Sequence, residues 1–264
     1  AVLLSGQFYL LLQQMQAASK EHNTFFFSWL YQLLFFLYVY FQITGYTDMA
    51  RGIAACYGYA LPKSSRLPLW NKQLSVFLQN WNRTVLRWFS RAFSSPKQTA
   101  ASLWLQMLFT YSVLGWFCRG TLTGFLGGLL VGVILAWFED VQKKWRFPTA
   151  IHWFLSIVCS VFAWSLFCSD TLTEAIQMWS NLLGLSKDAV SYQDLYFLQS
   201  SLLLLLIAGF CTSGWHCPIQ KWLKKRTLTA WIPTIVVPVG DVLFLGLSVL
   251  AMASDAVPPL FFRW

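Results

Sequence analysis

Six long apolar stretches constrain the fold of this chain more than any other feature of its sequence. They lie at residues 24–44, 98–118, 120–139, 148–168, 192–213 and 230–252. Each is long enough to cross a bilayer as a helix, which takes roughly 17–25 residues. Residues 1–18 are only partly apolar, and we expect them to be the end of a helix that starts upstream. The pattern predicts an all-α, polytopic transmembrane helical bundle with about six spans.

The composition excludes several other classes of protein. Of the 264 residues, 57% are hydrophobic and only 11% are charged, whereas about a quarter of the residues in a typical soluble domain are charged. A soluble enzyme and a disordered chain are therefore excluded. The six cysteines form no CxxC pair, and we interpret them as small buried hydrophobes rather than as a disulfide scaffold. We expect residues 1–264 to form a single integral membrane domain.

The basic residues are unevenly distributed between the connecting segments. Fifteen of the 19 Lys and Arg residues lie in segments 45–97, 140–147 and 214–229. Six spans place these three segments on one side, and the positive-inside rule then predicts that this side is cytoplasmic. The net charge of +9 is explained by contact with anionic lipid head groups. We therefore expect the lipid bilayer, and no nucleic acid, as a partner.

Two segments between the spans have the pattern of amphipathic helices. Segment 170–184 can be capped by Asp170 or Thr171 and closed by Gly184, and its apolar face predicts that it lies on the outer membrane surface. Segment 70–93 combines tryptophans at helical spacing with a stripe of arginines. This predicts a helix at the cytoplasmic interface or in a re-entrant position.

Two acidic residues in or beside the spans are candidates for a functional role, because an intramembrane carboxylate is costly. Asp48 lies at the cytoplasmic end of the first stretch, where it is either functional or pairs locally with Arg51. Asp241 lies in the last stretch, where it is either functional or bonded to the helix broken at Pro238.

The three histidines, at positions 22, 152 and 216, lack the spacing of metal ligands, and no hydrolase, metalloprotease or nucleotide-binding motif is present. Arg119 lies between two apolar stretches, where a short outer hairpin would expose it and a position at membrane depth would make it functional. Asn82 lies on the flank of the 70–93 segment, and its spacing alone favours a packing hydrogen bond.

A long motif then connects this chain to a known family. Residues 41–52 read Phe-Gln-Ile-Thr-Gly-Tyr-Thr-Asp-Met-Ala-Arg-Gly and follow an aromatic span. They resemble the F-D-F-S-G-Y-S/T-D-M-A-x-G signature of the membrane-bound O-acyltransferase family, in the branch of alginate O-acetylases and D-alanyl transfer proteins. Residues 77–88 resemble the family's F-W-x-R-W-H-x-S-L-x-x-W helix. There Trp81 matches a tryptophan, and Asn82 stands for a histidine, as it does in the lipid-modifying branches.

The resemblance covers nearly the whole chain and implies a fold, an activity and a site. Family members have further spans upstream, so the chain is expected to be the C-terminal part of such a fold. The implied activity is transfer of an acetyl-type acyl group to a hydroxyl of an exported or envelope polysaccharide, in the bacterial inner membrane. The matching catalytic positions are Asn82 and Arg119, and the matching substrate-binding positions are Tyr46, Asp48 and Trp81. No metal is implied.

The resemblance also implies partners. The acyl donor would be acetyl-CoA or an acyl carrier, with no resident cofactor. Other subunits for polysaccharide modification, or of a membrane complex, are expected alongside the chain.

The position of Arg119 departs from the family pattern. Counted back from Glu139, the family's W-H-G falls on Cys118-Arg119-Gly120, so arginine stands where the family has its catalytic histidine. Because arginine stays protonated, it cannot accept a proton from an acceptor hydroxyl, although it can hold an anionic group. Two interpretations remain open: an O-acyltransferase, or a catalytically degenerate relative acting as a scaffold or binding subunit. A small transporter is a third, less favoured interpretation.

Overall fold

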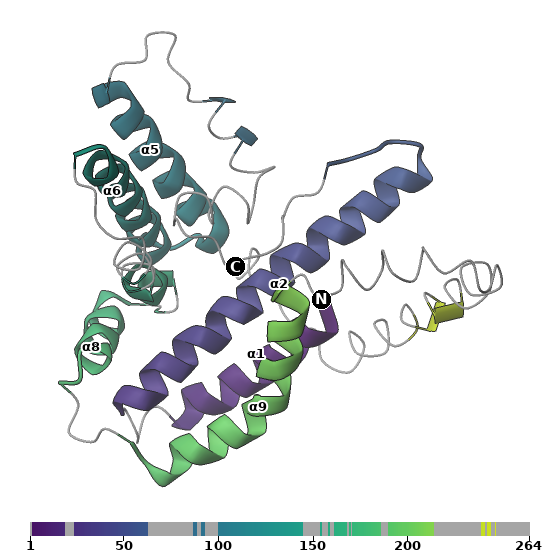
Figure 1. Cartoon of the computed structure of the whole chain (residues 1–264), viewed down its shortest axis with the longest axis vertical. Coiled ribbons are helices and arrows are strands. Elements are labelled where there is room, and N and C mark those ends of the chain that lie inside the picture. The colour runs from purple at the N-terminus through teal and green to yellow at the C-terminus, as the bar shows by residue number, and fades with distance from the viewer. Residues whose placement is uncertain are drawn as a thin grey trace.

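The computed structural model describes residues 2–18, 24–62, 87–88, 91–92, 100–144, 154, 158, 161–167, 169, 171–185, 190–213, 239–240, 242–243 and 246. Within these residues the regular elements are helical (Figure 1). The bounds are α1 Val2–Ala18, α2 Phe25–Cys56, α5 Ala100–Arg119, α6 Leu122–Lys144, α8 Leu172–Leu182 and α9 Tyr192–Ser213. The predicted all-α class agrees with this part of the chain.

Helix α2 is the longest of these elements, with 32 residues. It begins where the Thr24 hydroxyl accepts a hydrogen bond from the backbone N–H of Phe27, at 3.1 Å, which satisfies one of the free amides of the first turn. It ends at Tyr57 and Gly58, where the positive φ of Gly58 (81°) turns the chain away. At about 1.5 Å per residue it is longer than the roughly 30 Å hydrocarbon core of a bilayer.

Helix α1 runs antiparallel to α2 and covers one of its faces with aromatic rings. Phe8 stacks on Phe41 with ring centroids 6.1 Å apart, and Tyr9 lies 5.8 Å from Tyr38. The buried side chains of both helices belong to one hydrophobic cluster. Aromatic contacts of this kind add to the free energy gained from area burial, so they help to fix the register of the pair.

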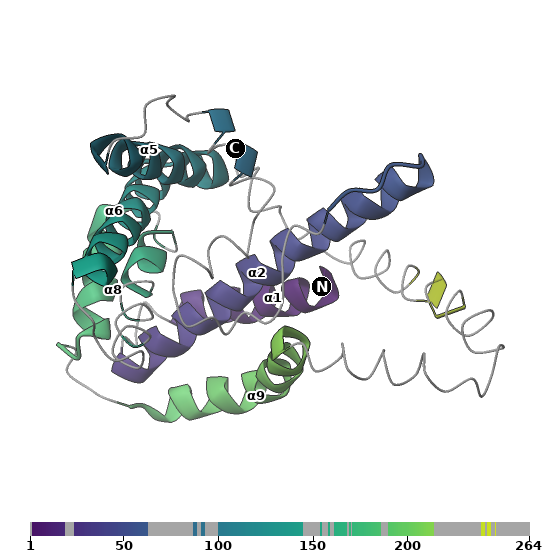
Figure 2. The ribbon, with the colours of Figure 1, turned by 45° about the horizontal axis from the view of Figure 1, so that its top comes forward.

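Helices α8 and α9 pack against α2 near its beginning, as Figures 1 and 2 show. The indole N–H of Trp29 donates to the carbonyl oxygen of Leu182 at 3.3 Å, where α8 ends. Phe27 meets Phe197 of α9 edge to face, with centroids 6.0 Å apart. These contacts bring α8 and α9, two helices that are distant from α2 in sequence, to its beginning.

Helices α5 and α6 form a close antiparallel hairpin. Glycines recur every fourth residue along α6, at Gly124, Gly128 and Gly132, a spacing that lets membrane helices approach closely. A methyl group added to Gly128 would clash with the backbone of Tyr111 on α5. The two helices can therefore approach closely because glycine has no side chain.

A short helical segment, residues 161–167, links this hairpin to α2 and α8. Trp164 packs edge to face on Phe36 of α2, with ring centroids 5.7 Å apart. Phe167 lies against Gly127 of α6. Trp179 of α8 donates its indole N–H to the carbonyl oxygen of Phe162 and to the hydroxyl of Ser165.

The number of membrane spans is a separate question from helix content. Among the described residues, two helices are long and apolar enough to cross a membrane: α2, and residues Tyr192–Thr212 of α9. Helices α5 and α6 carry shorter apolar runs, Met107–Trp116 and Leu122–Ile134. The predicted stretches 148–168 and 230–252 lie largely outside the described residues, so the number of six spans stays a prediction.

The amphipathic helix predicted at 170–184 is present as α8. Thr171 caps it by accepting a hydrogen bond from the backbone N–H of Glu174, and Gly184, with φ 77°, terminates it. Ala175 and Leu182 face the protein, whereas Leu172, Ile176 and Leu183 are exposed. The predicted segment 70–93 lies outside the described residues, apart from 87–88 and 91–92.

The hairpin contact predicts different effects for two glycine substitutions. Gly128→Ala should destabilise the protein by roughly 1–3 kcal/mol, because the added methyl group overpacks the interface with α5. Gly52→Ala is the matched control, since a Cβ there meets nothing within 4 Å and alanine favours a helix. Thermal unfolding in detergent, followed by circular dichroism, measures both. Equal midpoints for the two variants would contradict the close contact.

Candidate functional site

The motif at residues 41–52 occupies the C-terminal half of α2 and crosses the edge of the packed core. Phe41, Gln42, Ile43 and Gly45 are buried. Tyr46 is half-buried, and the helix is exposed from Asp48 to Ala50. One end of the motif therefore lies among the apolar side chains of the core, and the other end presents polar groups at the surface.

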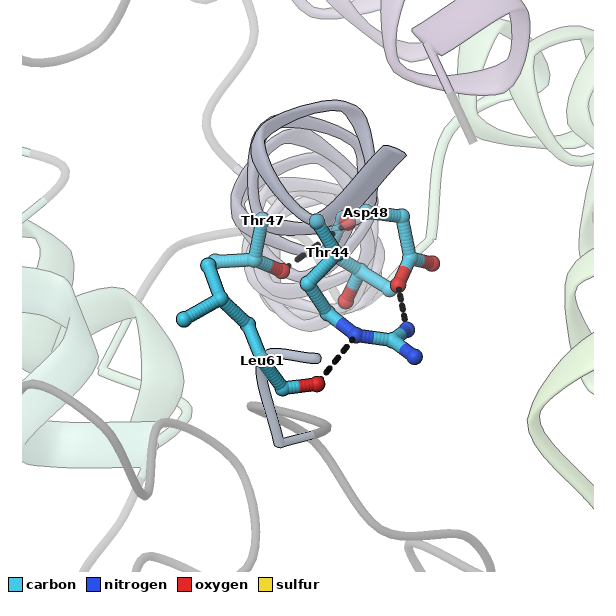
Figure 3. Close-up of polar contacts among 5 residues, drawn as sticks. Thr44, Thr47, Asp48 and Leu61 are labelled. Carbon is cyan, nitrogen blue, oxygen red and sulfur yellow. Dashed lines mark hydrogen bonds and ion pairs between the residues drawn. The ribbon is translucent and has the colours of Figure 1, made fainter. Parts of the chain in front are cut away.

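The exposed end carries a chain of local polar contacts (Figure 3). The Thr47 hydroxyl donates to the carbonyl oxygen of Thr44 at 3.0 Å. The guanidinium of Arg51 donates to Asp48 Oδ1 at 2.9 Å and, through Nε, to the carbonyl oxygen of Leu61 at 3.4 Å. Arg51 thereby ties the turn after α2 back to the helix.

The structure places Asp48 in the local role that the sequence allowed for it. Its side chain is 60% exposed and its ion pair with Arg51 spans three residues, and such surface pairs contribute about 0–1 kcal/mol. The pair leaves one carboxylate oxygen, Oδ2, outside the ion pair. Asp48 can therefore bind a hydrogen-bond donor while it stays paired.

Two polar atoms at the buried end of the motif, Gln42 Oε1 and Thr44 Oγ1, lack a hydrogen-bond partner among the residues that the structure describes. The other end of the Gln42 amide donates to the hydroxyl of Tyr46 at 3.4 Å. An unpaired buried polar group costs about 1–3 kcal/mol. The motif thus carries unused hydrogen-bonding capacity beside Tyr46, the first of the predicted substrate-binding residues.

Arg119 is the last residue of α5. Gly120 follows it with φ 67° and donates its N–H to the carbonyl oxygen of Trp116, and Thr121 accepts from the N–H of Gly124 in the first turn of α6. The backbone at Arg119 therefore lies at the tip of a tight hairpin. Its side chain lies outside the described part of the structure.

Of the predicted site residues, the structure describes the side chains of Tyr46 and Asp48. Tyr46 and Asp48 make their polar contacts within residues 42–61. Trp81 and Asn82 lie outside the described residues, as do Asp241 and the three histidines. The assembly of a site from Tyr46, Asp48, Trp81, Asn82 and Arg119 therefore stays a prediction. In the described part of the chain, no group of three His, Cys, Asp or Glu side chains could hold a metal ion.

The sequence analysis missed Asp194, a fully buried carboxylate in the first turn of α9. Its Oδ2 accepts from the Thr24 hydroxyl and from the N–H of Ser191, both at 2.7 Å. Its Oδ1 has no partner. The Ser191-x-x-Asp194 spacing before an apolar run resembles a capping box and could have drawn attention to it. The hydrogen bond from Thr24 to Asp194 joins the beginnings of α2 and α9. Because the two residues are far apart in the sequence, residue spacing could not have predicted it.

Comparison with known proteins finds bacterial O-acetylating enzymes. The chain is 22% identical over 168 residues to a peptidoglycan O-acetyltransferase of Helicobacter pylori, covering 60% of this chain and 32% of that protein. It is 21% identical over 192 residues to a probable alginate O-acetylase AlgI of Pseudomonas syringae pv. tomato, covering 70% and 37%. The corresponding protein of Pseudomonas aeruginosa is 24% identical over 168 residues, covering 60% and 31%.

The resemblance predicted from the motif is confirmed. This chain is a relative of bacterial O-acetyltransferases of the membrane-bound O-acyltransferase type. It spans about a third of the length of the curated relatives that it matches. No family model matches the chain, and no solved structure matches it.

The bond between Thr24 and Asp194 predicts a stability difference. Thr24→Val removes the cap of α2 and one of the two hydrogen bonds to a buried carboxylate, so it should lower the free energy of unfolding by about 2–4 kcal/mol. Thr171→Val, which removes only the exposed cap of α8, should cost about 1 kcal/mol. Thermal unfolding of the two variants makes the comparison. A Thr24→Val effect no larger than the control would show that Asp194 does not depend on Thr24.

Proposed function

We propose that this chain is the acyl-transferring part of a bacterial membrane O-acyltransferase. It would move an acetyl-type group from a cytoplasmic donor to a hydroxyl of an exported or envelope polysaccharide. The observation that carries the proposal is the similarity to O-acetylating enzymes over 60–70% of the chain. The motif on α2 supports the proposal. The residues that carry the family resemblance run from the buried core at Phe41 to the exposed surface at Asp48.

The proposal assigns roles along the direction of transfer. Tyr46, Asp48 and Trp81 would bind the donor at the cytoplasmic end of α2. The unpaired amide oxygen of Gln42 and hydroxyl of Thr44 would be available to a donor that extends into the core. Asn82 and Arg119 occupy the catalytic positions, and Arg119 would hold an anionic group rather than accept a proton. The donor is acetyl-CoA or an acyl carrier.

A second candidate function follows from Arg119 alone. Loss of a general base typically lowers a rate by about 10²–10⁴. A relative with arginine at the position of the family's histidine would keep the fold and serve as a scaffold or binding subunit of a membrane assembly. The two candidates differ in whether the unmodified protein transfers an acyl group above background.

An acyl-transfer assay with the full-length protein in vesicles separates the two. For the transferase, the unmodified protein should acetylate a polysaccharide acceptor, and Arg119→Ala should lower the rate at least 10-fold by removing an anion contact. For the degenerate relative, transfer should stay at background until Arg119→His supplies an imidazole that can accept a proton at neutral pH. Lys187→His, an imidazole on another predicted outer segment, is the control. Robust transfer that is insensitive to Arg119 and Asn82 would contradict this placement of the active site.

The orientation predicted from the basic residues is tested in intact cells. Cysteines introduced at Lys144 and at Lys187 should differ in labelling by a membrane-impermeant maleimide. Position 187 should be labelled from the outside, and position 144 only after permeabilisation, because the basic segments are retained in the cytoplasm. The unsubstituted protein reports the background from native cysteines. Equal labelling of both positions from outside would overturn the inner-membrane orientation.

A further inference from the structure

Asp48 and Arg51 are the only charged residues in the sequence from Gly45 to Pro62. Both lie on the part of α2 that leaves the packed core, where the side chain of Asp48 is 60% exposed and that of Arg51 30%. Nη1 of Arg51 lies 2.9 Å from Oδ1 of Asp48. The negative charge of Asp48 is therefore balanced, within this stretch, by one ion pair.

The guanidinium of Arg51 is held from two sides (Figure 3). Besides its bond to Asp48, it donates through Nε to the carbonyl oxygen of Leu61 at 3.4 Å. The N–H groups of a guanidinium lie in one plane with fixed directions. Two bonds from one such plane fix its orientation, so the positive charge stays beside the carboxylate of Asp48.

The family resemblance assigns no role to Arg51. The signature that residues 41–52 match specifies Asp48, but it leaves the position of Arg51 open, as the x of M-A-x-G. The contacts of Arg51 with Asp48 and Leu61 are consequently the basis for inferring what it does.

The charge of the proposed donor makes an unpaired Asp48 unfavourable. Coenzyme A and the prosthetic arm of an acyl carrier both contain phosphate, which is negatively charged at neutral pH. A carboxylate facing such a donor would be repelled, because like charges placed together cost free energy. Paired with Arg51, Asp48 adds no net charge, and its Oδ2 remains outside the ion pair. That oxygen can accept a hydrogen bond from an N–H or O–H group of the donor.

We propose that Arg51 is a positioning residue for a phosphate-bearing acyl donor and acts through Asp48. By neutralising this carboxylate, Arg51 allows Asp48 to accept a hydrogen bond from a ligand that would otherwise be repelled. The inference rests on the proposed function, because it takes Asp48 as a donor-binding residue. It goes beyond that function by giving the electrostatic condition under which Asp48 can bind an anionic donor.

The test is equilibrium binding of acetyl-CoA to the full-length protein in lipid nanodiscs. S-acetylpantetheine, which carries the acetyl group on the same arm without phosphate, is the matched ligand. Arg51→Gln removes the charge and keeps a side chain that can donate to Asp48, so it should weaken acetyl-CoA binding about 3- to 10-fold. Binding of S-acetylpantetheine should change less than 2-fold, since that ligand carries no charge to repel.

Salt and a charge-matched variant provide the controls. The loss in Arg51→Gln should shrink as salt is raised, because salt screens exposed charges. Arg51→Lys keeps the charge and should retain most of the affinity. Lys187→Gln, which removes a positive charge from a predicted outer segment, should have no effect.

A double variant separates charge from folding. Asp48→Asn combined with Arg51→Gln removes both charges and keeps a hydrogen-bond acceptor at position 48, so it should bind acetyl-CoA more tightly than Arg51→Gln alone. Damage to the fold would not be repaired by a second substitution. Unchanged acetyl-CoA affinity in Arg51→Gln, or an equal loss for both ligands that salt does not reduce, would overturn the inference and leave the proposed function standing.

The source of the phosphate is decided by a second donor. Where acetyl-CoA does not bind, an acetylated acyl carrier takes its place in the same comparison, and a carrier affinity insensitive to Arg51→Gln would overturn the inference. Absence of binding by both donors would overturn the proposed function, and the inference with it.

Discussion

Polar groups on apolar helices must find their partners within protein, and this constraint organises the structure. The backbone of each helix satisfies itself, and several hydroxyls bond to the preceding turn, such as Ser112 to the carbonyl oxygen of Leu108 at 2.7 Å. Asp194 cannot do this alone. Its carboxylate takes the Thr24 hydroxyl and the Ser191 amide, and so the beginning of α9 is held against the beginning of α2.

The same constraint distinguishes the two ends of the motif at residues 41–52 of α2. At the exposed end, Asp48 pairs with Arg51, and Arg51 also donates to the carbonyl oxygen of Leu61; water would also satisfy these groups. At the buried end, Gln42 Oε1 and Thr44 Oγ1 remain without partners among the described residues. An unpaired buried polar group in a native structure calls for an explanation, and these two lie within the stretch that carries the family resemblance.

The close packing of α5 against α6 fixes the position of the backbone at Arg119. Close packing through Gly124, Gly128 and Gly132 leaves room for only a tight turn between the two helices, and Gly120 provides it with its positive φ. The backbone of Arg119 is thereby held at the hairpin tip.

The sequence by itself determined the helical class, because apolar runs of more than 20 residues leave a chain no other way to satisfy its backbone in lipid. It also predicted the α8 helix from its cap and closing glycine, and the family resemblance from residues 41–52. The pair of Asp48 with Arg51, three residues apart on α2, was among the roles that the sequence left open and needs only helical register. The tertiary structure alone showed that Thr24 reaches Asp194 across 170 residues. Spacing along one helix describes that helix, whereas contacts between distant segments depend on how the helices pack.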